Sequence, residues 1–452
     1  MIASHAVANV ADIAKLRLVN KMFNRTLYDR NTWRYFQPIS VDIDIKTLLK
    51  YHKSLDWYHG LFRIHLTGTS PGHQRQLRRL KKYHPQMLIN LSDSHTLDVS
   101  PFSKVHTLML RNTKVADVSA LGNLFKLDLA HTKVVDVSAL SHVNTLNLHN
   151  TNVVDVSALT NVQHLIMSCT KVLNVSSLAH VRSLDLTQTN VVDVSALGHV
   201  HELYLSYTKV TDVSALGNVH ILDLTGTKVS DVSMLGNVHR LSLHSTDVKD
   251  VSALGNVYSL DLGFTDVTDV SALGKVRELH LTDTMVSDVS ALGNVHILNL
   301  ADTMVADVSA LTNVYCLILR GTQVSDVSAL GNTHMLNLSH TNVVDVSALT
   351  NVHTLHLSHT KVVDVSALAN VYSLDLCHTE VVDVSALGNV HTLELAYTKV
   401  VDVSSLGNVH TLDLSFTKVV DVSALGNVHT LNLADTEVVD VSALGNVLIW
   451  SA

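Results

Sequence analysis

The amino-acid sequence predicts an α/β repeat solenoid, in which a long parallel sheet alternates with short 3₁₀ or turn segments, preceded by a small α-helical module. Three observations predict it. A 19-residue unit recurs eighteen times between Asp98 and Asp440, without insertion or deletion. Valine and leucine dominate the unit, whereas aromatic residues make up 5% of the chain and proline totals four. Stacked coils require equal units in constant phase, and a closed globule does not.

The charge of the chain changes near residue 90. Residues 1–90 contain 15 Lys and Arg against 5 Asp and Glu, whereas residues 91–452 contain 17 against 35. The chain, with a formal net charge of −8, therefore consists of a basic segment followed by an acidic one. No apolar run approaches the ~18 residues of a membrane helix, and we expect neither a disordered chain nor a membrane protein.

Each unit is numbered here from its Asp as position 1. Apolar positions 11 and 13 alternate with a polar position 12, which is the period of a half-buried strand. Burying each apolar side chain contributes about 1.5–3 kcal/mol, and a single unit cannot shield them, so neighbouring units must stack. In the unit that starts at Asp402, the apolar positions 2, 5, 8, 11, 13 and 18 are Val403, Leu406, Val409, Leu412, Leu414 and Val419.

Three polar or small residues recur for structural reasons. Position 16 is Thr in every complete unit, from Thr113 to Thr436. We expect its hydroxyl to point inward and to satisfy backbone groups of the adjoining turn. The Asp of position 1 precedes V-S-A-L, which predicts the N-cap of a short 3₁₀ turn. Gly at position 6 suits a tight turn.

From position 8 the unit reads V-x-x-L-x-L-x-x-T-x-V. It resembles the leucine-rich repeat, with Thr in place of the usual Asn, and D-V-S-A-L-G-N-V is similar to the bacterial internalin subfamily. The resemblance covers residues 98–447 and implies a parallel sheet on a concave face and a short convex side. The Asp row lacks the G-x-D pattern of calcium-binding β-rolls, so we expect no calcium.

Two irregular units precede the array. Residues 63–66 and 88–91 are predicted strands, and residues 73–84 form a predicted basic amphipathic helix. At the other end, Trp450 falls at position 11, where the strand leucine is expected. The sequence predicts three segments: a helical module over 1–40, a linker helix with irregular repeats over 41–97, and the regular solenoid over 98–452.

The helical module has a recognisable motif. Ile13, Leu16, Val19 and Phe23 recur at helical spacing. The pattern D-(I/L)-x-x-L-R-L-V-x-K-x-(W/F)-N-x8-W of residues 12–33 is similar to the C-terminal two-thirds of an F-box, although the opening Leu-Pro of that family has no counterpart. The resemblance implies that residues 1–38 bind the S-phase-kinase-associated adaptor of a cullin–RING ubiquitin ligase. The adaptor contacts it implies are Leu16, Leu18, Val19, Phe23 and Trp33. The alternative is an apolar helix pair that caps the first repeat.

Positions 9, 10, 12, 14 and 15 are expected to face solvent on the concave side, and they vary most between units. Exposed aromatic residues and arginine are favoured contacts in protein interfaces. The alternative is that these are scattered surface aromatics. The candidate target-binding residues are Tyr204, Tyr207, Phe264, Tyr315, Arg320, Tyr397 and Phe416.

Histidine is abundant, with 29 residues, and recurs at positions 9 and 15. Such rows are able to bind a transition metal or sense pH, but no Cys or carboxylate completes a convergent ligand set, so we expect solvated rows and no metal. The three cysteines form no paired spacing, which indicates a reducing compartment. Cys316 and Cys377 lie three units apart, about 14 Å, too far for a disulfide.

No nucleophile–base set, P-loop or dinucleotide motif occurs, so we expect neither an enzyme nor a cofactor. The acidic array would repel nucleic acid. The leading hypothesis is a monomeric substrate-recognition subunit of a cullin–RING ubiquitin ligase, in the cytoplasm, with its protein target on the concave face. The alternative is a free-standing repeat scaffold or effector without a ligase link. The near-identical repeats are also similar to those of F-box proteins from large DNA viruses of amoebae, which implies the host cytoplasm.

Overall fold

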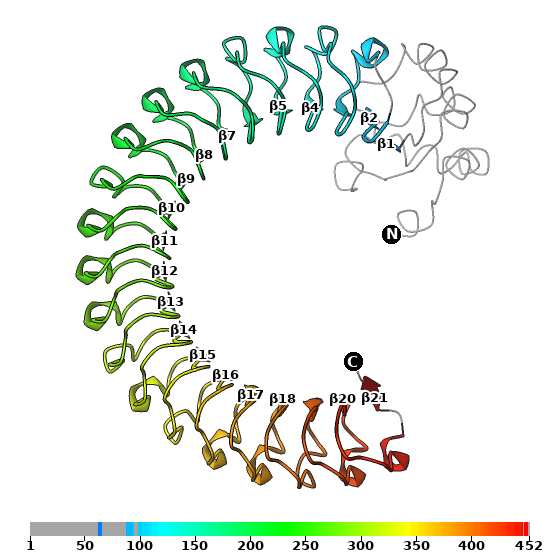
Figure 1. Ribbon diagram of the computed structural model, residues 1–452, viewed down its shortest axis with the longest axis vertical. Helices are drawn as coiled ribbons and strands as arrows, with labels where there is room; N and C mark the ends of the chain where they lie inside the picture. Colours follow the sequence, from blue (N-terminus) through cyan, green and yellow to red (C-terminus); the bar gives the residue numbers. More distant parts are fainter. Residues whose placement is uncertain (1–61, 66–86, 95–97, 446, 451–452) are drawn as a thin grey trace, which may run out of the picture. The chain divides into compact units, whose positions relative to one another are not determined.

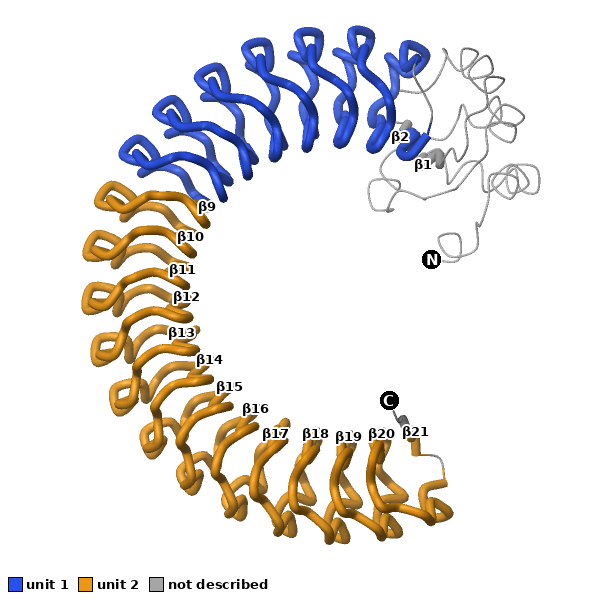
Figure 2. The backbone as a smooth tube through the Cα atoms, viewed as in Figure 1, with its two compact units in different colours: residues 1–222 blue, residues 223–452 orange. Residues whose placement is uncertain are grey.

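The computed structural model describes residues 62–65, 87–94, 98–445 and 447–450. The chain divides into two compact units, Met1–Leu222 and Asp223–Ala452 (Figure 2). Within each unit, equal coils stack one on another, and each coil contributes one short strand to the inner side and one turn to the outer side (Figure 1). This arrangement confirms the predicted repeat solenoid.

Unit 1 contains a parallel sheet in which consecutive strands pair. Its strands are β1 (Phe62–His65), β2 (Met87–Asn90), β3 (Thr107–Met109), β4 (Lys126–Asp128), β5 (Thr145–Asn147), β6 (His164–Ile166), β7 (Ser183–Asp185) and β8 (Glu202–Tyr204). β1 and β2 confirm the strands that were predicted in the irregular units. β9 (Ile221–Asp223) includes the boundary between the two units.

Unit 2 repeats this order of consecutive parallel pairs. Its strands are β10 (Arg240–Ser242), β11 (Ser259–Asp261), β12 (Glu278–His280), β13 (Ile297–Asn299), β14 (Cys316–Ile318), β15 (Met335–Asn337), β16 (Thr354–His356), β17 (Ser373–Asp375), β18 (Thr392–Glu394), β19 (Thr411–Asp413), β20 (Thr430–Asn432) and β21 (Leu448–Trp450). β10 to β20 cover positions 10 to 12 of their units, and the central leucine of each strand is buried in the core.

The outer side carries three-residue 3₁₀ turns over positions 3 to 5, as predicted. In unit 1 these are η3 (Ser100–Phe102), η4 (Ser138–Leu140), η5 (Ser176–Leu178), η6 (Ser195–Leu197) and η7 (Ser214–Leu216). In unit 2 they are η8 (Ser252–Leu254), η9 (Ser271–Leu273), η10 (Ser290–Leu292), η11 (Ser328–Leu330), η12 (Ser366–Leu368), η13 (Ser385–Leu387), η14 (Ser423–Leu425) and η15 (Ser442–Leu444).

The register follows the repeat length, because residue i pairs with residue i+19. Leu393 faces Leu412, and Leu412 faces Leu431. The last pair differs, since Leu431 faces Ile449 and Asn432 faces Trp450. The final coil is thus one residue shorter, and Ile449, not Trp450 as predicted, takes the place of the strand leucine.

The core consists of the six predicted apolar positions. In the coil that starts at Asp402, Val403 is 2% exposed and Leu406, Val409, Leu414 and Val419 are fully buried. Each coil is only one strand wide, so its apolar side chains are covered by the coils before and after it. The stack is therefore stabilised mainly by contacts between neighbouring coils.

The turn after each strand has the same geometry in every unit, and the Thr of position 16 stabilises it. In all 18 complete units its hydroxyl donates a hydrogen bond to the carbonyl of position 13, three residues earlier. The inward orientation was predicted, but the partner was expected in the adjoining turn. The short Thr side chain reaches only a carbonyl of its own coil, so it closes that turn.

The Asp of position 1 caps the 3₁₀ turn from one residue further out than predicted. Val251 is the N-cap of η8, whereas the Asp250 carboxylate accepts a 2.9 Å hydrogen bond from the backbone N–H of Ser252. The backbone and hydroxyl of Ser252 together lower the pKa of Asp250. Asn174 accepts the equivalent bond from Ser176, so the turn needs the side-chain oxygen and not the charge.

Gly at position 6 has a different role from the predicted one. Gly255, directly after η8, has φ −60°, which any residue adopts. A Cβ at Gly255 would lie 2.5 Å from the carbonyl oxygen of Ala272 in the next coil. The residue is small because neighbouring coils approach closely there, and not because the turn is tight.

The helices predicted over residues 12–36 and 73–84 lie outside the described residues. Among the residues that are described, none belongs to a helix with the length and apolar character needed to cross a bilayer. The three cysteines are free thiols.

Candidate functional site: ring rows and a carboxylate strip

Two rows of stacked rings run along unit 2. The position-9 row joins eight rings with centroids 4.5–4.9 Å apart: His296, Tyr315, His334, His353, Tyr372, His391, His410 and His429. The position-15 row joins five rings with centroids 4.2–4.3 Å apart: His340, His359, His378, Tyr397 and Phe416.

Backbone hydrogen bonds between coils impose this stacking. The N–H of His391 donates to the carbonyl of Tyr372 in the preceding coil, and the N–H of Tyr397 donates to the carbonyl of Ser415 in the next one. The backbone is thus tied to a neighbouring coil at positions 9 and 15 alike. Rings that branch from these points repeat at the strand spacing of about 4.8 Å, which is a favourable distance for stacked rings.

Position 15 also has an unusual backbone conformation. Every position-15 residue from Asn112 to Asp435 has a positive φ, between 52° and 60° for the non-glycine residues. Gly226 and Gly321 occupy two of these sites, and no Val, Ile or Thr occurs at any of them. This left-handed conformation strains β-branched and bulky side chains, so the aromatic residues here cost stability and are held by the turn around them.

Stacking changes the protonation of the histidines. Burial lowers the pKa of His340 and His378, and the neighbouring His359 lowers both further. Burial and the two flanking imidazoles lower the pKa of His410 in the same way. Protonated neighbours repel each other, so these rings favour the neutral state at neutral pH.

A strip of ionisable residues lies on the strand face between the two rows. His356, Asp375, Glu394 and Asp413 occupy position 12 of four consecutive strands, β16 to β19. The Asp375 and Asp413 carboxylates each accept a backbone N–H two residues later, which closes the turn after the strand. Burial and the charges of Asp375 and Asp413 raise the pKa of the Glu394 side chain.

His356 partly neutralises this strip. Its Nδ1 lies 3.6 Å from Oδ2 of Asp375. Hydrogen bonding to Asp375 raises the pKa of His356 despite the burial of the ring. For Asp375, burial acts to raise the pKa, but the hydrogen bonds from His356 and from the Cys377 backbone outweigh it, and the net pKa lies below the ordinary value.

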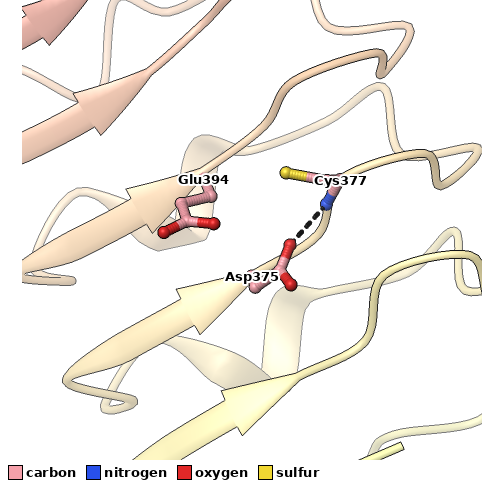
Figure 3. A group of neighbouring side chains, drawn as sticks. All are labelled: Asp375, Cys377 and Glu394. Atoms are coloured by element: carbon pink, nitrogen blue, oxygen red, sulfur yellow. Dashed lines mark hydrogen bonds between the residues drawn. The ribbon is translucent and has the colours of Figure 1, made fainter. Parts of the chain in front are cut away.

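Cys377 joins this strip from position 14 (Figure 3). One donor atom from each of Asp375, Cys377 and Glu394 lies within 4.8 Å of the others. Burial and the charge of Asp375 strongly raise the pKa of the Cys377 thiol, which favours its protonated form. The three residues offer sulfur and oxygen donors of the types that divalent metals use. The cluster was not predicted, and it contains no histidine of the two rows. The signal was available, since residues i, i+2 and i+19 are neighbours in a 19-residue coil.

The predicted target contacts of unit 1 lie on β8 and the turn after it. Tyr204 is half-buried and borders a shallow pocket of about 440 Å³ over β5 to β8, which His164, Ile166 and Asp185 also line. Tyr207 is 59% exposed and belongs to position 15.

The predicted contacts of unit 2 fall into separate groups. Tyr397 and Phe416 stack with centroids 4.2 Å apart at the end of the position-15 row. Tyr315 stacks between His296 and His334.

The remaining two predicted contacts lie away from these rows. Phe264 packs against His244 at 5.0 Å. Arg320 forms a 2.8 Å ion pair with Asp302 of the preceding coil, so its charge is already engaged. The predicted adaptor contacts, Leu16 to Trp33, lie outside the described residues.

The comparisons with known proteins address the fold. No family model matches the chain, and no curated protein sequence does. A leucine-rich-repeat protein of Leptospira interrogans is similar in structure, with a TM-score of 0.57 and 18% identity over 73% of this chain and 96% of that one. The fold is a leucine-rich-repeat solenoid.

Two further leucine-rich-repeat structures are similar. The functional domain of InlJ from Listeria monocytogenes has a TM-score of 0.50 and 18% identity, over 76% of this chain and 73% of that one. Mouse RP105, in complex with MD-1, has a TM-score of 0.60 and 16% identity, over 88% of this chain and 86% of that one. At these identities the likeness establishes the fold alone.

In this leucine-rich-repeat solenoid, sequence reasoning identified the histidine rows at positions 9 and 15 and individual aromatic residues, but it missed that the aromatic residues continue those rows. Tyr372, which continues the position-9 row, was not among the candidate contacts. The carboxylate strip was also missed, because position 12 was considered one unit at a time. Aligning the units in columns of 19 would have revealed both features.

Proposed function

We propose that this chain is a non-enzymatic protein-interaction adaptor whose target binds the strand face of the repeats. The observation that carries the proposal is the pair of exposed ring rows that flank the strand face of unit 2. Tyr397, Phe416 and Tyr315 are 43–47% exposed although they are large and partly apolar. Exposed, pre-ordered aromatic side chains lose little entropy on binding and are frequent anchors in interfaces.

The recurrent Asp and Ser residues support a binding role rather than catalysis. Each Asp–Ser pair near a histidine resembles part of a catalytic set in its composition. In the coils, however, the Asp carboxylate accepts the Ser backbone N–H, as in Asp250 with Ser252 and Asp364 with Ser366. The pair is repeated along the array because every coil needs its turn closed.

The finer proposal assigns the chain to a cullin–RING ubiquitin ligase, as the cytoplasmic subunit that recognises the substrate. It rests on the F-box resemblance of residues 12–33, through Leu16, Leu18 and Val19. The free-standing scaffold without a ligase link is the second candidate. The mouse RP105 structure, a protein of the same fold in complex with MD-1, supports protein binding in either case.

Photo-cross-linking tests the binding face. A photoreactive phenylalanine analogue replaces Thr411 on β19 in one variant and the exposed Ala424 of η14 in a matched control. Expressed in amoebal cells, the Thr411 variant is expected to give discrete protein adducts that the Ala424 variant lacks. Equal adduct patterns from both positions would refute binding at the strand face.

A pull-down tests the ligase link. The S-phase-kinase-associated adaptor is expected to retain the full wild-type chain and to lose the variant Leu18→Asp/Val19→Asp. Absence of wild-type retention would leave only the free-standing scaffold.

A further inference from the structure

The strand face of β15 to β19 carries three carboxylates and no lysine or arginine. Over the five coils from His334 to Phe416, positions 9, 10, 12, 14 and 15 hold the carboxylates of Asp375, Glu394 and Asp413 and neither Lys nor Arg. The lysines of these coils occupy position 17, beyond the buried Thr, and Lys399 there is paired with Glu380. Histidines supply the counter-charge when they are protonated: His356 pairs with Asp375, and Asp375 also acts on His378.

The rings give this strip two aromatic borders. The position-9 row borders it with His353, Tyr372, His391 and His410, and the position-15 row with His359, His378, Tyr397 and Phe416. Their faces stack on one another, so the edges and the exposed ends of the rows are presented to a partner. Tyr397 and Phe416 are 47% and 43% exposed, which leaves apolar surface beside the carboxylates.

We propose that the strip of Asp375, Glu394 and Asp413, with its two ring rows, is a docking site for a basic polypeptide segment rich in arginine. This inference rests on the proposed protein-binding function and names the chemistry of the partner. Guanidinium groups pair with carboxylates in a fixed fork. They also pack against a ring face, which is available at the exposed end of the position-15 row.

The dimensions and the charge favour a polypeptide as the occupant. Carboxylates on three consecutive strands extend over about 10 Å, two strand spacings. Same-side residues of an extended chain repeat at about 6.8 Å, so two or three arginines of one segment cover the strip. A nucleic acid is disfavoured because its phosphates carry the same charge as the strip.

The carboxylates of the strip carry like charges on neighbouring strands. Burial and then the charges of Asp375 and Asp413 raise the pKa of Glu394, so its two neighbours repel the ionised form of Glu394 in the free protein. A bound cationic segment removes that repulsion. The complementarity therefore contributes both to affinity and to the rate of association at low ionic strength.

Position 12 offers substitutions that remove charge and keep the turn. Asn already occupies this position in β15 and β20, where Asn337 and Asn432 accept the same backbone N–H that Asp accepts elsewhere. The charge variant is Asp375→Asn/Glu394→Gln/Asp413→Asn. The matched control is Asp128→Asn/Asp261→Asn on β4 and β11, which makes the same exchange away from the strip.

Position 15 offers an equally mild change of the rings. Asn112 and Asn150 have the left-handed backbone that Tyr397 and Phe416 have, so Tyr397→Asn/Phe416→Asn is compatible with the turn. The matched control is His131→Asn in unit 1, which removes a ring from the same position and the same left-handed backbone. Circular dichroism and thermal unfolding identify any variant that does not fold.

The test is fluorescence anisotropy of the full chain with a labelled peptide of alternating arginine and serine, at low ionic strength. We expect the charge variant to bind at least about tenfold more weakly than wild type, and the ring variant about fivefold more weakly. Both controls should bind like wild type. A peptide with glutamate in place of arginine should not bind.

Equal binding by wild type and the charge variant, or equal binding of the arginine and glutamate peptides, would overturn the proposal. If Thr411 gives specific photo-adducts but the arginine peptide does not bind, this inference fails and the proposed function stands. If neither is observed, the proposed function fails as well.

Discussion

The hydroxyl of Thr322 donates a 2.6 Å hydrogen bond to the carbonyl of Leu319, which also accepts the Thr322 backbone N–H at 3.2 Å. Thr322 is 1% exposed, so both of its donors are satisfied within one coil, away from water. The same bond in every complete unit turns the chain sharply after the strand. That turn leads position 15 out to the surface immediately before the buried threonine.

The first prediction concerns this bond. Thr322→Val keeps the shape of the side chain and removes the hydroxyl donor, so the free energy of unfolding should fall by about 1 kcal/mol. Thr268→Val, at an exposed position 19, is the control and should change it by less than about 0.5 kcal/mol. Urea unfolding followed by circular dichroism measures both, and equal midpoints for the two variants would contradict the role given to the hydroxyl.

The same substitution should have the opposite effect at Thr333. This residue replaces the Val of position 8 and is fully buried, and its hydroxyl has no hydrogen-bond partner. Thr333→Val removes the unsatisfied oxygen and restores the apolar residue, so the free energy of unfolding should rise by about 1 kcal/mol. A lower urea midpoint than wild type would show that the hydroxyl is satisfied in solution.

Asp375 should control the reactivity of Cys377. Burial and then the charge of Asp375 raise the pKa of this thiol, whereas burial alone raises the pKa of Cys316. Asp375→Asn should therefore increase the alkylation rate of Cys377 at mildly alkaline pH, because more of the thiol is ionised. Mass spectrometry of the alkylated peptides measures it, with Cys316 as the internal control. An unchanged rate at Cys377 would mean that the carboxylate does not act on the thiol.

The pair of His356 and Asp375 predicts a pH dependence of stability. The pKa of His356 is raised above 6.5 in the folded chain, so folding favours its protonated form. Its contribution is complete below pH 6.5, the ordinary value, and is lost as the pH rises through the higher folded value.

The comparison with His356→Asn isolates this contribution, because Asn occupies the same position in β15. The melting temperature of wild type should exceed that of the variant by more at about pH 5.5 than at about pH 8.5. A difference that stays constant, or grows with pH, would contradict the assigned direction. The stacked histidines are present in both proteins and cancel in the comparison.

Much of the fold could be predicted because each coil repeats the same solution. The buried positions of Leu412 and Leu414 and the 3₁₀ turn after Asp402 follow from periodicity and capping alone. The partner of the Thr322 hydroxyl could not be predicted in this way. Several carbonyls lie within reach of an inward threonine, and only the backbone path selects the carbonyl of Leu319.

The candidate site was predicted in part. Tyr397 and Phe416 were recognised as exposed aromatics, but their stacking depends on the left-handed backbone at position 15. Asn112 and Gly226 at position 15 of other units indicate that conformation, because Asn and Gly favour it. The aromatic residues at position 15 give no such indication. The adaptor contacts around Leu18 lie outside the described residues, and the F-box-like module stays a prediction.

Cys377 provides the most direct test of the claim that the strand face of unit 2 binds a basic protein segment. Its thiol lies beside Asp375 and Glu394, whereas Cys169 belongs to unit 1 and serves as the reference. We predict that saturating arginine–serine peptide slows the modification of Cys377 by a small thiosulfonate reagent and leaves Cys169 unchanged. Equal rates at Cys377 with and without saturating peptide would contradict the account.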